Sequence, residues 1–87
     1  MKETIDIVPY CEENCICLEY VPGADIRLET GHNALSIRAN AEGLQFLAKV
    51  CLTLVQGDVP QGSHIHLDGF DFVRANDVDL TMERCDP

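Results

Sequence analysis

The stretch ALSIRANAEGLQFLAKVCLTLVQG, residues 34–57, changes its hydrophobic period part-way along and so decides the fold. Its first six residues alternate between apolar and polar side chains, which is typical of a half-buried β-strand. Leu35 and Ile37 would lie on the core side of that strand. From Asn40 to Gly57 the apolar residues recur at the spacing of an amphipathic helix. A strand followed directly by a helix is therefore predicted, with Asn40 as the helix N-cap.

The predicted helix has one apolar and one polar face, and Gly57 would end it as the C′ residue. The apolar face, which we expect to cover a sheet, consists of Leu44, Leu47, Ala48, Cys51, Leu52 and Val55. The polar face, which we expect in solvent, consists of Glu42, Gln45, Lys49, Thr53 and Gln56.

Four further segments alternate with a period of two and are predicted strands: residues 15–21, 25–30, 63–68 and 78–83. Residues 4–8 are a candidate edge strand, ended by Pro9. Turn signals at Pro22-Gly23 and Gly31-His32-Asn33 would join the first three strands into a meander. The sequence therefore predicts one α+β domain, a two-layer sandwich with one helix on a mostly antiparallel sheet of about five strands, in the order β-β-β-α-β-β.

The composition is that of a small acidic protein. The 87 residues allow one modest core. Fifteen Asp and Glu residues against six Lys and Arg residues give a net charge of −9. This charge disfavours nucleic acid and anionic membranes as partners and favours a basic protein. The simpler explanation of the acidity is solubility.

Sequence signals for export or membrane insertion are missing. The first residues lack the apolar core of a signal peptide, and no apolar run approaches the ~20 residues of a membrane span. The five cysteines are an odd number, which indicates thiols in a reducing compartment. We expect a cytoplasmic protein without a cofactor.

The segment HIHLD at residues 64–68 divides into two faces. Its two aliphatic side chains would point into the core, whereas His64, His66 and Asp68 would point to the open side of the sheet. That open side is predicted to carry, in addition, Glu19, Arg27, Glu29, Arg38, Asp79, Thr81 and Glu83. Its charge would be mixed but mainly acidic.

Histidines near cysteines raise the alternative of a metal site. His64 and His66 could reach one ion from adjacent positions on a strand face, with Cys15 or Cys17 as a further ligand. The simpler interpretation is a solvated strand face with histidines packed across the strands and incidental thiols.

The connection at residues 69–77 places Phe70 and Phe72 beside Asp71. Either the two rings fold back to cap the core, or they anchor an interface whose acidic side chain complements a basic partner. No glycine-rich phosphate loop, nucleophile elbow or zinc-protease helix is present, so no catalytic residue is predicted.

Three pieces of the run from Ala34 to Glu83 carry a family resemblance: Asn40-Ala41-Glu42-Gly43-Leu44, Gly62-Ser63-His64-Ile65-His66-Leu67-Asp68 and Val78-Asp79-Leu80-Thr81. Together they resemble the immunity protein 32 family of bacterial polymorphic-toxin systems. The resemblance implies a protein that is not an enzyme and that binds and neutralises a toxin of the same bacterium. It implies that His66, Leu67 and Asp68 are signature positions, which either contact the toxin or hold the fold.

The leading hypothesis is an immunity protein that binds a toxin through the open sheet face and the following loop; the acidity of the chain favours a basic toxin. Its predicted partner-binding residues are His64, His66, Asp68, Phe70, Asp71, Phe72, Asp79 and Glu83. Two alternatives stay open: a small metal-binding domain, and a domain that forms homo-oligomers through its open faces or edges.

Overall fold

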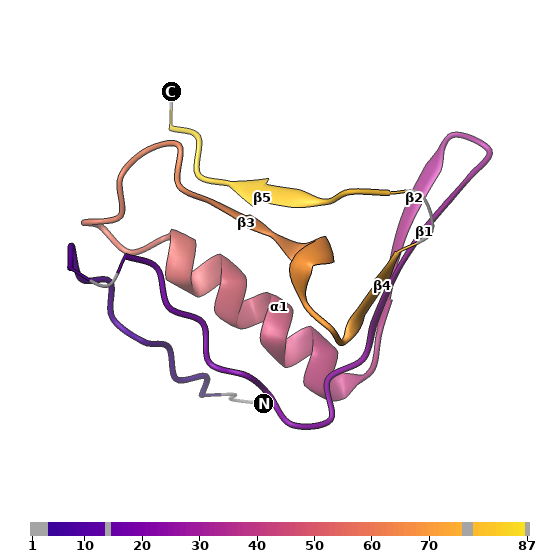
Figure 1. The fold of residues 1–87 in the computed structure, drawn as a ribbon, viewed down its shortest axis with the longest axis horizontal. Helices are drawn as coiled ribbons and strands as arrows, with labels where there is room; N and C mark the ends of the chain where they lie inside the picture. Colours follow the sequence, from indigo (N-terminus) through magenta and orange to yellow (C-terminus); the bar gives the residue numbers. More distant parts are fainter. Residues whose placement is uncertain (1–3, 14, 76–77, 87) are drawn as a thin grey trace.

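The computed structural model describes residues 4–13, 15–75 and 78–86, which form one α-helix and five strands (Figure 1). In chain order the elements are β1 (Ile26–Gly31), β2 (Ala34–Ala39), α1 (Ala41–Leu54), β3 (His64–His66), the 3₁₀ turn η1 (Leu67–Gly69), β4 (Val73–Ala75) and β5 (Thr81–Glu83). The predicted α+β class, with one helix against mostly antiparallel strands, is confirmed. The order along the chain is β-β-α-β-β-β, because one predicted strand is missing and one unpredicted strand is present.

The strands form two sheets rather than the expected single sheet. β1 pairs with β2 antiparallel and with β4 parallel, so the first sheet has the order β2-β1-β4. β3 and β5 form a separate antiparallel pair. β4 lies inside the segment 69–77, which the sequence predicted to be a connection. Figure 1 shows the β3–β5 pair passing along α1, with the three-stranded sheet at the end where the helix begins.

The core lies between α1 and the two sheets. Its buried apolar side chains include Ile26 and Leu28 of β1, Phe46, Val50 and Leu54 of α1, Ile65 of β3, Leu67 of η1 and Val73 of β4. The prediction that Ile65 and Leu67 point into the core is confirmed. Burial of each such large apolar side chain stabilises the fold by about 1.5–3 kcal/mol, so this cluster is the main stabilising feature.

The β1–β2 hairpin closes through His32 and Asn33, whose φ angles are 42° and 66°. Positive φ at both central residues is characteristic of the type I′ turn, whose twist matches the right-handed twist of the two strands that it joins. Leu35 and Ile37 of β2 are 53% and 46% exposed, so their predicted place in the core is wrong. Leu28 on the central strand is buried, whereas Ile37 opposite it is exposed because it lies on the edge strand.

The helix is confirmed, but its buried face is not the predicted one. The buried residues of α1 are Gly43, Phe46, Val50, Thr53 and Leu54. Four residues predicted for the core are exposed: Cys51, and Leu44, Leu52 and Val55 with exposed fractions of 57%, 40% and 67%. Thr53, predicted to be in solvent, is 1% exposed.

The physical reason is that α1 has apolar residues around most of its circumference, so their spacing does not fix which side faces the core. Gly43 fixes it instead. A Cβ atom at Gly43 would lie 2.6 Å from the backbone oxygen of Asp25, so the helix and the start of β1 cross closely on this side. The residues that share a face with Gly43 are therefore the buried ones.

The predicted strand at residues 15–21 is wrong, and the candidate edge strand at residues 4–8 is not a strand either. In the described residues up to Ala24 there is no strand, and one isolated bridge joins Cys11 to Cys15. Ile16 and Leu18, on the apolar side of the alternation at residues 15–21, nevertheless pack against the core.

The N-terminal segment instead runs antiparallel to α1. The backbone N–H of Tyr10 donates to Gln56 Oε1 over 2.8 Å just after the helix, and Glu19 lies 3.9 Å from Lys49 Nζ further back along it. Figure 1 shows this segment on the side of α1 away from the β3–β5 pair. The backbone N–H and C=O groups within a helix are already paired with one another. An extended chain beside the helix therefore cannot form strand hydrogen bonds with it.

The helix ends at Leu54 with Val55 as its C-cap, so Gly57 is not its C′ residue. The last turn has no basic residue of its own. Arg84, which follows β5, donates hydrogen bonds to the backbone oxygens of Leu54 and Gln56. A guanidinium group here satisfies open carbonyl groups and complements the negative end of the helix dipole.

Candidate partner-binding site

The β3–β5 pair presents one apolar and one polar face. His64 lies opposite Glu83 and His66 opposite Thr81, and all four are exposed. Ile65, between the two histidines, is buried on the other side. The placement of these polar residues on an open face is as the sequence predicted.

The two histidine rings lie against each other at 4.9 Å between centroids, with an interplanar angle of 87°. His66 Nδ1 lies 3.0 Å from Thr81 Oγ1, across the two strands. His64 Nδ1 lies 3.1 Å from the backbone oxygen of Gly62. Since a carbonyl oxygen only accepts, this contact needs the His64 proton on Nδ1. The rings are thus oriented from within the protein, while their surfaces remain accessible.

Asp68 does not lie on this face, although the sequence predicted that it would. β3 ends at His66, and Asp68 belongs to the turn η1, where it is half-buried. Its Oδ1 accepts a hydrogen bond from the backbone N–H of Leu80 over 3.2 Å, next to the bond from Leu67 N to Leu80 O at 2.9 Å. Asp68 therefore connects η1 to the chain that enters β5.

Phe70 and Phe72 pack edge-on against the buried ring of Phe46, at centroid distances of 5.0 and 4.8 Å. Both are half-buried, and Tyr20 lies 5.6 Å from Phe72. An open hollow of about 580 Å³ beside them is lined by Leu18, Tyr20, Phe46, Phe70, Asp71 and Phe72. The aromatic residues thus extend the core outward and also line a surface hollow. Tyr20 itself is 61% exposed.

The remaining predicted acids lie apart from one another. Asp71 is exposed at the rim of the aromatic hollow, and Asp79 is exposed beside a second hollow of about 560 Å³ that Asp68 also lines. The structure therefore groups His64, His66 and Glu83 on one face and leaves Asp71 and Asp79 on separate rims.

The residues of the metal-binding alternative do not form a ligand set. Cys15 and Tyr10 line one hollow of about 510 Å³ with His64. Within residues 4–13, 15–75 and 78–86, no group of three or more His, Cys, Asp and Glu side chains is arranged to hold a metal ion. Desolvation, followed by the charges of Cys15 and Glu12, raises the pKa of Tyr10, so its phenol stays protonated at neutral pH.

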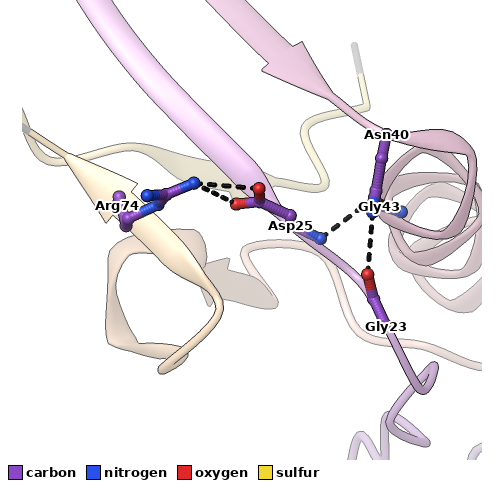
Figure 2. A network of polar contacts seen from close by, with 5 residues as sticks. All are labelled: Gly23, Asp25, Asn40, Gly43 and Arg74. Atoms are coloured by element: carbon purple, nitrogen blue, oxygen red, sulfur yellow. Dashed lines mark hydrogen bonds and ion pairs between the residues drawn. The ribbon is translucent and has the colours of Figure 1, made fainter.

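The start of α1 is tied to the chain before β1 (Figure 2). Asn40 Oδ1 accepts from the backbone N–H groups of Gly43 and Asp25 over 2.8 and 3.0 Å, and Asn40 Nδ2 donates to Gly23 O over 2.8 Å. Arg74 of β4 in turn holds the Asp25 carboxylate at 2.7 and 2.8 Å. The predicted N-cap is confirmed, whereas its links to Gly23 and Asp25 have no local signal in the sequence.

The model of the family described as immunity protein 32 matches residues 34–85, more than half of the chain. This chain belongs to the immunity protein 32 family. The family match begins at β2 and takes in α1, both histidines, η1 and Arg84. Neither the curated proteins nor the solved structures give a match to the chain. In the part of the chain that the structure describes, no helix has both the length and the apolar character to cross a bilayer.

The structure shows which of the residues that resemble the family are buried or bonded within the protein and which are exposed. Of the motif His66-Leu67-Asp68, Leu67 is fully buried and Asp68 is held by the backbone of Leu80, whereas His66 is exposed. At the helix start, Asn40 and Gly43 both serve the crossing of α1 and β1. Of these five residues, all but His66 therefore hold the fold.

Proposed function

We propose that this protein is an immunity protein that binds and neutralises a toxin of the same bacterium, in the cytoplasm and without catalysis of its own. The observation that carries the proposal is the match to the immunity protein 32 family over residues 34–85. A family of immunity proteins implies a protein partner in general terms. The identity of that partner as a toxin that is inhibited is the proposal.

The outer face of the β3–β5 pair is the proposed contact surface. Its support is that His64, His66 and Glu83 are exposed side by side on paired strands that have an apolar inner side. Phe70, Phe72, Asp71 and Asp79 would extend the contact through the hollows next to the two strands. Asp68 would act indirectly, because it holds the turn that ends β3.

The net charge of −9 supports a basic partner, since opposite charges raise the rate of encounter. An acidic protein seated over the channel of a basic enzyme, such as a nuclease, would also repel its polyanionic substrate. Binding should then weaken as salt rises, because screening shortens the range of the attraction.

Co-expression with the toxin encoded next to this gene tests the proposal. The wild-type chain should restore growth and co-purify with the toxin, whereas a variant with His66→Ala and Glu83→Lys should fold normally and protect less. If the wild-type chain neither protects nor co-purifies at low salt, the proposal is wrong. Circular dichroism of both proteins separates lost contacts from lost folding.

The outer face of α1 favours a second candidate function, self-association. Leu44, Leu52 and Val55 are exposed there, and the charged residues of the helix, Glu42 and Lys49, lie toward the N-terminal segment. Two copies could pair through this uncharged stripe without bringing like charges together. A concentration series in sedimentation velocity tests it: Leu52→Glu should abolish a dimer, and a monomer at millimolar wild-type protein would refute it.

A further inference from the structure

Three arginines form a row on the outer face of the three-stranded sheet. In the register of the strands, Arg27 on β1 pairs with Arg38 on β2 on one side and with Arg74 on β4 on the other. All three side chains are exposed, and both neighbours of Arg27 along β1 are buried on the opposite face. Since paired strands lie ~4.8 Å apart, the three side chains leave adjacent backbone positions. Half of the six basic residues of this acidic chain lie in this row.

Like charges at directly opposite positions destabilise a sheet, so the row has an energetic cost. Two of its members recover part of that cost within the protein. Arg74 holds the Asp25 carboxylate at 2.7 and 2.8 Å, as Figure 2 shows, and Arg38 lies 3.9 Å from Glu29. Both pairs are well exposed, so each offsets only a small part of that cost.

Arg27, in the middle of the row, is different. Among the described residues, no carboxylate lies within 4.0 Å of its guanidinium group. It stands between two shallow hollows. One, of about 230 Å³, is lined also by Arg38, Asn40 and Asp25, whose carboxylate Arg74 already holds. The other, of about 280 Å³, is lined also by Arg74 and Glu29. An incoming anion could therefore reach Arg27 together with either neighbouring arginine.

We propose that the arginine row, Arg27, Arg38 and Arg74, is a carboxylate-binding site for an acidic side chain of the protein partner. Guanidinium groups bind carboxylates in a planar, bidentate geometry, which explains three arginines where lysines would supply the same charge. That the partner is the toxin rests on the proposed function, whereas the carboxylate site itself does not.

A carboxylate of a protein fits this site better than a nucleic acid does. A polyanion would approach the whole molecule, whose net charge is −9, and be repelled. A single carboxylate on a protein surface experiences mainly the charges within the Debye length of ~8 Å, where the row is positive. The partner would then present a basic surface to the acidic face and an acidic side chain to the row.

Nuclear magnetic resonance of the full ¹⁵N-labelled chain tests the site directly, with glutarate as the probe at constant ionic strength. The side-chain Nε–H signals of the three arginines should shift in a saturable manner. Arg27→Gln should weaken the binding at least tenfold, and Lys49→Gln, which removes the same charge from α1, should leave it unchanged. Absence of saturable shifts, or equal binding by the two variants, overturns the proposal. Tighter binding of phosphate or of a single-stranded oligonucleotide overturns the carboxylate assignment.

Binding of the purified toxin by isothermal titration calorimetry separates this proposal from the proposed function. Arg27→Gln should lose at least tenfold in affinity and Lys49→Gln less than twofold. If the wild-type chain binds glutarate but not the toxin, the toxin-binding function fails and the site stands. If the toxin binds both variants as it binds the wild type, the role of the row in partner recognition is overturned.

Discussion

The start of α1 and the outer face of the β3–β5 pair differ in what their polar atoms contact. At the helix start, the amide of Asn40 makes three hydrogen bonds to other parts of the chain, and Gly43 has no space for a Cβ atom. On the β3–β5 face, His64 and Glu83 point outward on paired strands. Polar atoms that join distant segments build the framework. The histidines contact Gly62 and Thr81 beside them, and their exposed rings stay available for recognition.

The motif His66-Leu67-Asp68 contains both kinds of residue within three positions. Leu67 is buried and Asp68 holds Leu80, while His66 remains on the open face. Neighbouring residues of one short stretch therefore divide between holding the fold and facing solvent. Four variants test this contrast between framework and face, and their expected effects on stability decrease from Gly43 to the histidine face.

Gly43→Ala should have the largest effect and lower the free energy of unfolding by about 2–3 kcal/mol, because overpacking forces α1 away from β1. A Cβ atom there would lie 2.6 Å from the Asp25 oxygen and 3.0 Å from Ala39 Cβ. Urea denaturation measures the change. Gly57→Ala is the matched control, since nothing lies within 4 Å of its added atom. A neutral or stabilising Gly43→Ala, as helix propensity alone predicts, would contradict the close crossing.

Asn40→Ala should cost about 1–2 kcal/mol, the usual effect of removing an N-cap side chain. It removes the acceptor of Gly43 N and Asp25 N together with the donor to Gly23 O. Asn40→Asp keeps the acceptor and loses only the donor, so it should destabilise less in the same urea titration. Equal stability of the two variants would mean that the cap does not link the helix to the chain before β1.

Asp68→Ala should cost about 1 kcal/mol, because the backbone N–H of Leu80 loses its acceptor. Asp68→Asn retains an acceptor oxygen and should lose less. Asp71→Ala, at an exposed position, should leave the melting temperature unchanged. If Asp68→Ala were as stable as the wild type but bound the toxin poorly, Asp68 would belong to the recognition face after all.

His64→Ala together with Glu83→Ala should have the smallest effect on stability, within about 0.5 kcal/mol, because both side chains are exposed. The same variant should bind the toxin at least tenfold more weakly if these residues are central to the contact. Thermal denaturation and calorimetry measure the two quantities on one protein sample. A loss of stability without a loss of affinity would assign this face to the framework.

Local patterns predicted the parts of the fold that depend on neighbouring residues. The helix with its Asn40 cap, the strand at residues 34–39, the positive φ region near Asn33 and the inward side chains of Ile65 and Leu67 are all present. Period and capping are local properties, so they can be read from a single chain. The two exposed histidines of the candidate site were found in the same way.

Contacts between distant residues could not be predicted from local pattern. Apolar and polar residues do alternate at residues 15–21, but this segment lies beside a helix and has no strand to pair with. β4 is short and has no pattern of its own, and it becomes a strand only because β1 pairs with it. The arginine row exists only in the register that brings Arg27, Arg38 and Arg74 together.

The fold class, the helix, the family and the acidic character could be read from the sequence, because each follows from composition or from residues close together in the chain. Contacts between distant segments were needed to establish which side of α1 is buried, how the strands divide into two sheets and which polar residues stay exposed. The helix is apolar around most of its circumference, so its buried side depends on the close crossing of α1 and β1 at Gly43. Asn40, Asp68 and Arg84 form hydrogen bonds to the backbone and so hold this fold, whereas other polar residues remain exposed and accessible to a partner.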